Sequence, residues 1–176
     1  MYICPVISAA DAQDIFETKK RLNPFSFFRR AQFKKTELFH VPLFLFEILV
    51  QAEEKKSNTV ISCDAIMGET AIFQGEDHRH SEQAQGTVCE PVLEQEQAKE
   101  LARKYGHALI LNQAMGYGRK ASLQDVNFVE MIFYPYWIGY FKKGGRYDFR
   151  IIDSMTGQLQ GPKFRRLFLQ ALRQLT

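Results

Sequence analysis

The sequence predicts an α+β fold with an internal duplication, in which a helix followed by an antiparallel hairpin occurs twice and a C-terminal amphipathic helix follows. Two observations lead to this prediction. Three short blocks recur in the same order along the chain, and apolar residues follow helical or strand periodicity within each half. The 176 residues are 45% hydrophobic and 24% charged, with 15 Phe and 7 Tyr, which is ample material for a core and excludes a disordered or fibrous chain.

The recurring blocks differ in spacing but keep their order, which indicates insertions in the loops between them. They are PVIS at 5–8 and PVLE at 91–94, the Pro-containing apolar segments at 37–45 and 130–138, and the Asp-x-x-x-Gly segments at 64–68 and 153–157.

These blocks define the expected domain organisation. We expect a first α+β repeat at residues 1–75 and a second at 87–161. A polar segment without periodicity, at 76–86, is expected to link them, and the C-terminal helix occupies 162–176.

A helix opens each expected repeat. Ser8 and Asp11 have the spacing of a capping box, and the apolar residues after them recur at i, i+3 and i+4, which predicts a helix over residues 8–21. The same pattern predicts a second helix over 94–105, with Gly106 as its C-terminal cap.

A hairpin follows each helix. Segments 43–50 and 136–141 are apolar on both alternating faces, which is typical of strands covered on two sides. The glycine pair at 144–145 supplies the positive φ of a tight turn in the second hairpin.

The chain closes each hairpin with an Asp-x-x-x-Gly turn. Asp side chains accept hydrogen bonds from the amides just ahead of them, and glycine supplies a left-handed residue. We therefore interpret four residues as structural turn residues, namely Asp64, Gly68, Asp153 and Gly157.

The last helix is expected to begin at Pro162, because proline suits the first turn of a helix. Apolar residues recur at i, i+3, i+4, i+7 and i+8 from Phe164, and the opposite side is basic.

The second repeat resembles a PepSY-type module. The resemblance covers a Glu/Ala-rich helix at 94–105, the segment YWIGYF at 136–141, a glycine turn, a strand at 147–153 and the Thr156-Gly157 pair; residues 5–74 resemble the family more faintly. It implies a cystatin/PepSY-like fold and a protein-binding or protease-inhibiting role. Separately, no catalytic motif is recognised along the chain, so no catalytic residue is predicted.

A basic, Phe-rich segment at 18–36 is the most informative charge feature, because it contains seven Lys and Arg, four Phe and no acidic residue. It can follow a phosphate backbone while rings stack on bases, rest on an anionic membrane, or form a core-anchored loop with solvated charges. The C-terminal helix strengthens the binding interpretations only if the fold brings both regions together. The candidate binding residues are Phe27, Phe28, Arg29, Arg30, Lys34, Lys35, Arg165 and Arg166.

No cofactor or metal is predicted. Cys4, Cys63 and Cys89 lack the spacing of a zinc site or a disulfide scaffold, which favours a reducing compartment and a cytoplasmic location. His78 and His80 are weak metal-ligand candidates, because they fall in the expected linker, where ligands are not held rigidly. No signal peptide or transmembrane segment is expected.

Three function classes follow, in this order. The first is a non-enzymatic intracellular module that binds a protein or another ligand, since a duplicated α+β unit without a catalytic motif is a common binding scaffold. The second is binding of nucleic acid or an anionic surface through 18–36 and the C-terminal helix. The third is an enzyme with a pocket between the repeats. A protein partner is expected first, and a homo-oligomer is left open.

Overall fold

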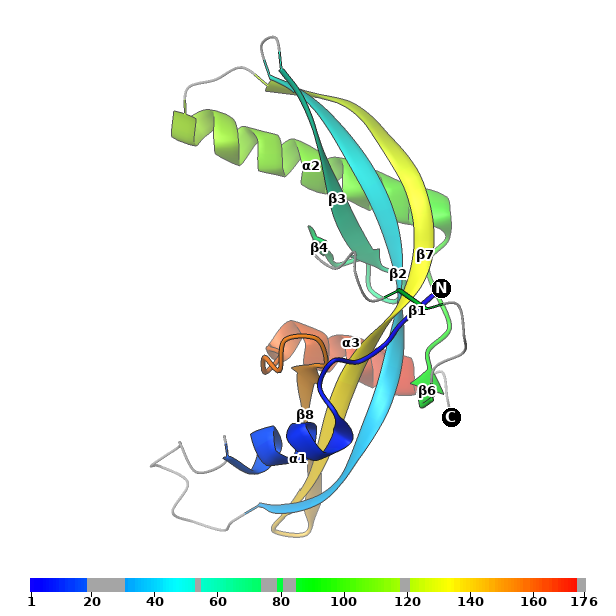
Figure 1. Ribbon diagram of the computed structural model, residues 1–176, viewed down its shortest axis with the longest axis vertical. Coiled ribbons are helices and arrows are strands. Elements are labelled where there is room, and N and C mark those ends of the chain that lie inside the picture. Colours follow the sequence, from blue (N-terminus) through cyan, green and yellow to red (C-terminus); the bar gives the residue numbers. More distant parts are fainter. Residues whose placement is uncertain (19–30, 53–54, 74–78, 81–84, 118–120, 174–176) are drawn as a thin grey trace. The chain divides into compact units, whose positions relative to one another are not determined.

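The computed structural model describes residues 1–18, 31–52, 55–73, 79–80, 85–117 and 121–173 (Figure 1). Within these residues eight strands form one mixed sheet in the order β4-β3-β2-β7-β1-β5, with β6 beside β2 and β8 beside β7. No described helix is both long and apolar enough to cross a membrane. The elements are β1 (Tyr2–Ile3), α1 (Ala9–Thr18), β2 (Gln32–Ala52), β3 (Lys55–Asp64), β4 (Thr70–Ile72), β5 (Arg79–His80), β6 (Thr87–Val88), α2 (Gln95–Tyr117), β7 (Ala121–Lys143), β8 (Arg146–Asp153) and α3 (Pro162–Leu172).

The expected duplication of a helix-plus-hairpin unit is wrong. The strands belong to one large sheet, and each of the first two helices packs on the hairpin expected for the other repeat. In α1, Phe16 lies edge-on to Phe141 of β7, with ring centroids 6.1 Å apart, whereas Ala98 and Ala102 of α2 lie in a core with residues of β2 and β3. The sequence interpretation assumed that neighbours along the chain pack together, which is a tendency and not a rule.

Backbone hydrogen bonds attach the segment before each of these two helices to the hairpin on which the helix packs. The amides of Val6 and Ile7, just before α1, donate to the carbonyl oxygen of Ser154 after β8, at 3.1 and 2.8 Å. In the same way the amides just before α2 donate to the turn after β3. There, Val92 and Leu93 donate to the carbonyl oxygen of Ala65 at 2.7 and 2.8 Å.

Contacts between residues divide the chain into two compact units, and neither is a continuous stretch. The chain passes between the units inside β2, after Val41, and inside β7, after Phe133. The unit boundaries therefore differ from the expected ones at residues 75 and 87. Unit 1 comprises Met1, Pro42–Arg79 and Glu90–Phe133, and unit 2 comprises Tyr2–Val41, His80–Cys89 and Tyr134–Thr176.

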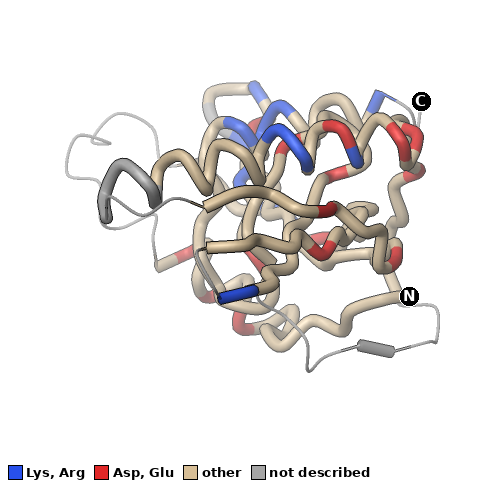
Figure 2. The backbone as a smooth tube through the Cα atoms, turned by 90° about the horizontal axis from the view of Figure 1, so that it is seen from above, with Lys and Arg blue, Asp and Glu red and all other residues tan. Residues whose placement is uncertain are grey.

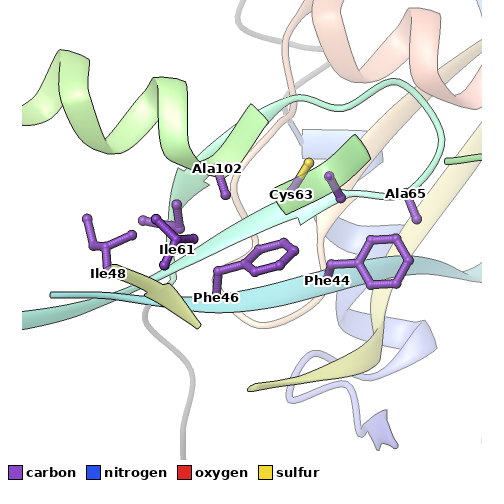
Figure 3. Close-up of a cluster of buried hydrophobic side chains, with 9 residues drawn as sticks. Phe44, Phe46, Ile48, Ile61, Cys63, Ala65 and Ala102 are labelled. Carbon is purple, nitrogen blue, oxygen red and sulfur yellow. The ribbon is translucent and has the colours of Figure 1, made fainter. Parts of the chain in front are cut away.

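The core of unit 1 lies between α2 and the β2–β3 hairpin (Figure 3). Phe44, Phe46 and Ile61 are buried there against the small Ala98 and Ala102 of α2. Small residues let a helix lie close to a sheet, so that the strand side chains fill the space beneath it.

Gly106 belongs to the interior of α2, which continues to Tyr117, so the expected helix end at Gly106 is wrong. A Cβ atom at this position would lie 3.5 Å from a methyl carbon of Leu123 and 3.7 Å from one of Ile48, which is ordinary contact distance. The helix continues because it buries side chains on both sides of the glycine, namely Ala98 and Ala102 before it and Ile110 after it.

The core of unit 2 places α1 on one face of the β7–β8 hairpin. Phe16, Trp137 and Ile152 are buried together, and the indole N–H of Trp137 donates to the carbonyl oxygen of Ile7 at 2.8 Å. Gly139 lies directly under α1, where a Cβ atom would come within 2.7 Å of the Phe16 ring. The contact between α1 and the hairpin therefore requires glycine at this position.

His40 of β2 is fully buried in unit 2, and neither of its ring nitrogens has a hydrogen-bond partner among the described residues. The ring lies edge-on to Tyr2 at 5.6 Å. Burial lowers the pKa of His40 from 6.5 to about 4, because the charged imidazolium is poorly solvated there.

The same substitution at two glycines should have opposite effects. Gly139→Ala should lower the free energy of unfolding by about 1–3 kcal/mol, because the new methyl group overlaps the Phe16 ring. Gly106→Ala should raise it by up to about 1 kcal/mol, because alanine is the better helix former and the space admits a methyl group. Urea unfolding of both variants measures the difference; equal effects would contradict the packing of α1 on β7.

Stability should decline as the pH falls from about 6.5 towards 4. In that window the unfolded chain binds a proton at His40 and the folded chain does not, so the loss reaches about 3 kcal/mol near pH 4. Urea unfolding at several pH values measures this slope. His40→Leu should flatten it and the exposed His107→Leu should not; identical slopes for the wild type and His40→Leu would refute this explanation.

Candidate functional site

The two units differ in net charge. Among the described residues, unit 2 has 10 Lys and Arg against 6 Asp and Glu, a formal charge of +4, and unit 1 has 6 against 9, a formal charge of −3. Figure 2 marks the positions of these charged residues along the backbone. Residues 1–75 contain 9 basic and 9 acidic residues, so the difference in net charge between the units is not visible along the linear sequence. The basic residues of unit 2 lie at the start of β2, in the β7–β8 hairpin and on or just after α3, whereas the described part of α1 has none.

The β7–β8 hairpin presents aromatic residues on one face near its tip. Lys142 pairs with Tyr147 across the strands, and Tyr140 pairs with Phe149. Residues directly opposite one another in an antiparallel pair point to the same face, as do residues two apart. These four side chains therefore share one face of the hairpin, which ends in a tight turn whose glycines have φ of 56° and 82°.

A cation lies over each of the three aromatic rings. The ammonium of Lys35 is 5.1 Å from the ring centroid of Tyr140, and that of Lys142 is 5.7 Å from Tyr147. The guanidinium of Arg165 lies 4.4 Å from the ring of Phe149. All three distances are within the range of cation–π attraction. We call this set the aromatic–cationic face: Lys35, Tyr140, Lys142, Tyr147, Phe149 and Arg165.

Arg165 is held in place by β8. Its guanidinium donates to the carbonyl oxygen of Phe149 at 2.9 Å and pairs with the carboxylate of Asp148 at 2.7 Å. Burial raises the pKa of Asp148, but the hydrogen bond from Arg165 and the amide of Phe149 outweigh it, so the net shift is downward. Asp148 therefore stays ionised, and Arg165 joins α3 to the hairpin.

Lys35 is held similarly, by Glu37 two residues along β2. Burial raises the pKa of Glu37, whereas hydrogen bonds from Lys35 and Tyr140 lower it, and the net shift is downward. Lys142 and Arg146, in contrast, form no ion pair with any described carboxylate. Glu37 and Asp148 thus hold Lys35 and Arg165 in place, whereas Lys142 and Arg146 at the tip have no such carboxylate partner among the described residues.

Helix α3 covers the same face of the sheet further from the tip. Phe164 and Phe168 lie 5.1 and 6.3 Å from the ring of Tyr136, which shares a face with Tyr140. The exposed side of α3 carries Lys163 and Arg166. A basic helix surface thus adjoins the aromatic–cationic face through Arg165.

The predicted binding residues divide into three groups. Phe27, Phe28, Arg29 and Arg30 lie outside the described residues. Lys35 and Arg165 belong to the aromatic–cationic face, while Lys34 is exposed and donates to Gln32 at 2.8 Å, and Arg166 is exposed on α3. These four described residues all belong to unit 2. Most of segment 18–36 lies outside the described residues, so whether the fold brings it together with the C-terminal helix stays a prediction.

Four residues of the face were missed by sequence reasoning: Tyr140, Lys142, Tyr147 and Phe149. The motif KKGGRYDF at 142–149 was interpreted only as the turn and the returning strand of a hairpin. Its alternation of aromatic and basic residues around a glycine turn was the available signal, since alternate strand residues share a face.

The four predicted turn residues form their turns in two ways: the Asp side chains accept hydrogen bonds from backbone amides, and the glycines adopt positive φ. Asp64 Oδ1 accepts from the amides of Ile66 and Met67 at 3.1 and 2.7 Å, and Gly68 has φ 78°. In the second turn, Asp153 Oδ1 accepts from the amides of residues 155 and 156 at 2.8 and 3.0 Å, and Gly157 has φ 68°.

Metal-ligating and nucleophilic groups do not converge in the described part of the chain. No group of three or more His, Cys, Asp or Glu side chains there is placed to hold a metal ion; His78 and the side chain of His80 lie outside the described structure. Burial raises the pKa of the Cys63 thiol to about 12 and that of Cys89 to about 11. Both thiols are therefore protonated at neutral pH and poor nucleophiles.

Comparisons of the chain with protein-family models, with curated proteins and with solved structures found no match. The resemblance to the PepSY family therefore stays a prediction. Functional interpretation of this chain depends on its own residues, and above all on the aromatic–cationic face.

Proposed function

We propose that the protein is a non-enzymatic binding module whose unit 2 binds nucleic acid. The observation that supports this function is the aromatic–cationic face, where three rings and three cations alternate at the end of a hairpin. Basic side chains gain affinity for a phosphate backbone by releasing its counterions. Aromatic side chains among them suit the π faces of bases, so the combination fits nucleic acid better than a simple anion.

An anionic membrane is the less suitable ligand, because the apolar side of α3 is already packed on the sheet and only Leu169 remains as an exposed large apolar side chain of this helix. Leu167, Phe168 and Ala171 are buried, and Phe168 packs on Phe39 at 5.3 Å. A helix that lies in a membrane interface buries its apolar side among the lipids. The outward side of α3 is basic and suits phosphate groups that remain in water.

A protein partner and a homo-oligomer stay predictions from the sequence, as do the cytoplasmic location and the enzyme with an unidentified pocket. No described group of residues favours any of them over the others. For nucleic-acid binding, in contrast, specific residues of unit 2 are proposed, and each of them can be substituted separately.

A charge reversal in unit 2 should weaken binding, and the same reversal in unit 1 should not. Arg166→Glu removes an exposed cation of α3, so affinity for a labelled oligonucleotide should fall several-fold and the salt slope should decrease by about 1. The matched control is Lys104→Glu on the exposed side of α2, which makes the same change in net charge. Fluorescence anisotropy at about 50 and 200 mM salt measures both.

Two outcomes would contradict this function. Equal losses for Arg166→Glu and Lys104→Glu would mean that binding follows net charge and not a surface of unit 2. Absence of wild-type binding at the lower salt concentration would exclude nucleic acid. Vesicles containing anionic lipid, tested in parallel, would then show whether a membrane is the ligand.

A further inference from the structure

Tyr147 is the most exposed large apolar or aromatic side chain in the described part of the chain, at 71%. It lies directly after the turn of the β7–β8 hairpin, opposite Lys142. The described side chains at this tip, from Lys142 to Asp148, are all exposed. Tyr147 therefore contributes no ring to either face of the core, and packing does not explain an aromatic residue at this position.

The other two rings of the aromatic–cationic face are less accessible. Phe149 is half-buried under the guanidinium of Arg165, which two contacts to β8 hold over the ring. Tyr140 is half-buried below Lys35, which Glu37 holds. The cation over the exposed Tyr147 ring is the ammonium of Lys142, 5.7 Å from the ring centroid. A lysine on a flexible stem with no carboxylate partner can move aside or turn to a phosphate.

We infer, on the basis of the proposed function, that the ligand is single-stranded nucleic acid and that Tyr147 stacks on an unpaired base. Lys142 and Arg146 then contact the phosphates on either side of that base. Bases inside a duplex have both faces covered by their neighbours, so an exposed ring has a stacking partner only where a base is unpaired. Stacking is indifferent to base identity, so the site tolerates many sequences.

The test compares Tyr147→Leu with Tyr147→Phe in the full chain. Leucine keeps an apolar side chain but removes the ring, so affinity for a labelled single-stranded oligonucleotide should fall roughly 5- to 150-fold, while affinity for the matching duplex is unchanged. Phenylalanine keeps the ring and should bind as the wild type does. Since Tyr147 is exposed, both variants should keep the wild-type melting temperature.

Two further variants give independent readouts. In Tyr147→Trp the new indole is exposed, whereas the single native tryptophan, Trp137, is buried. Its fluorescence should therefore be quenched when the single strand is added and should not change with duplex. Arg146→Gln should weaken both ligands, because a phosphate contact carries no information about base pairing.

The outcomes separate this inference from the proposed function. If Tyr147→Leu leaves single-strand affinity unchanged while Arg166→Glu still weakens binding, stacking at Tyr147 is wrong and nucleic-acid binding stands. Equal losses for single strand and duplex would also exclude stacking. If the wild type binds neither oligonucleotide, both fail.

Discussion

The carbonyl oxygens of Ala65 and Ser154 determine which hairpin each of the first two helices covers. Each accepts two amide hydrogen bonds from the segment that leads into a helix, and each belongs to the turn that follows a hairpin. The segment before α1 is thereby attached to the β7–β8 hairpin and the segment before α2 to the β2–β3 hairpin. The two units follow the same division, since α1 and the β7–β8 hairpin belong to unit 2 and α2 and the β2–β3 hairpin belong to unit 1.

Because α1 and α3 pack with the β7–β8 hairpin, basic residues that lie far apart in the sequence belong to the same unit. Lys34 and Lys35 begin β2, the basic tip ends β7 and begins β8, and Arg165 and Arg166 lie near the C-terminus, yet all belong to unit 2. The acidic start of α2 belongs to unit 1. The contacts of Arg165 with β8 and of Lys35 with Tyr140 then join these separate segments into one surface. The aromatic–cationic face is thus a property of the fold and not of any continuous segment.

Local structure was more predictable from the sequence than long-range packing. The periodicities from Ser8 and Phe164 indicated α1 and α3, and the glycine pair at 144–145 indicated a tight hairpin, because these depend on neighbouring residues. The pairing of helices with hairpins could not be predicted, since similar blocks fit either partner equally well. The aromatic–cationic face was missed for the same reason, because it combines residues from β2, β7, β8 and α3.

Hydrogen–deuterium exchange of the full chain, with and without a single-stranded oligonucleotide, tests most directly whether unit 2 alone provides the binding surface. Bound ligand should slow exchange in the β7–β8 hairpin near its tip, at the start of β2 and in the first turns of α3. Exchange in α2, β3 and β4, which belong to unit 1, should be unchanged. Protection centred on α2, or protection spread equally over both units, would contradict this account.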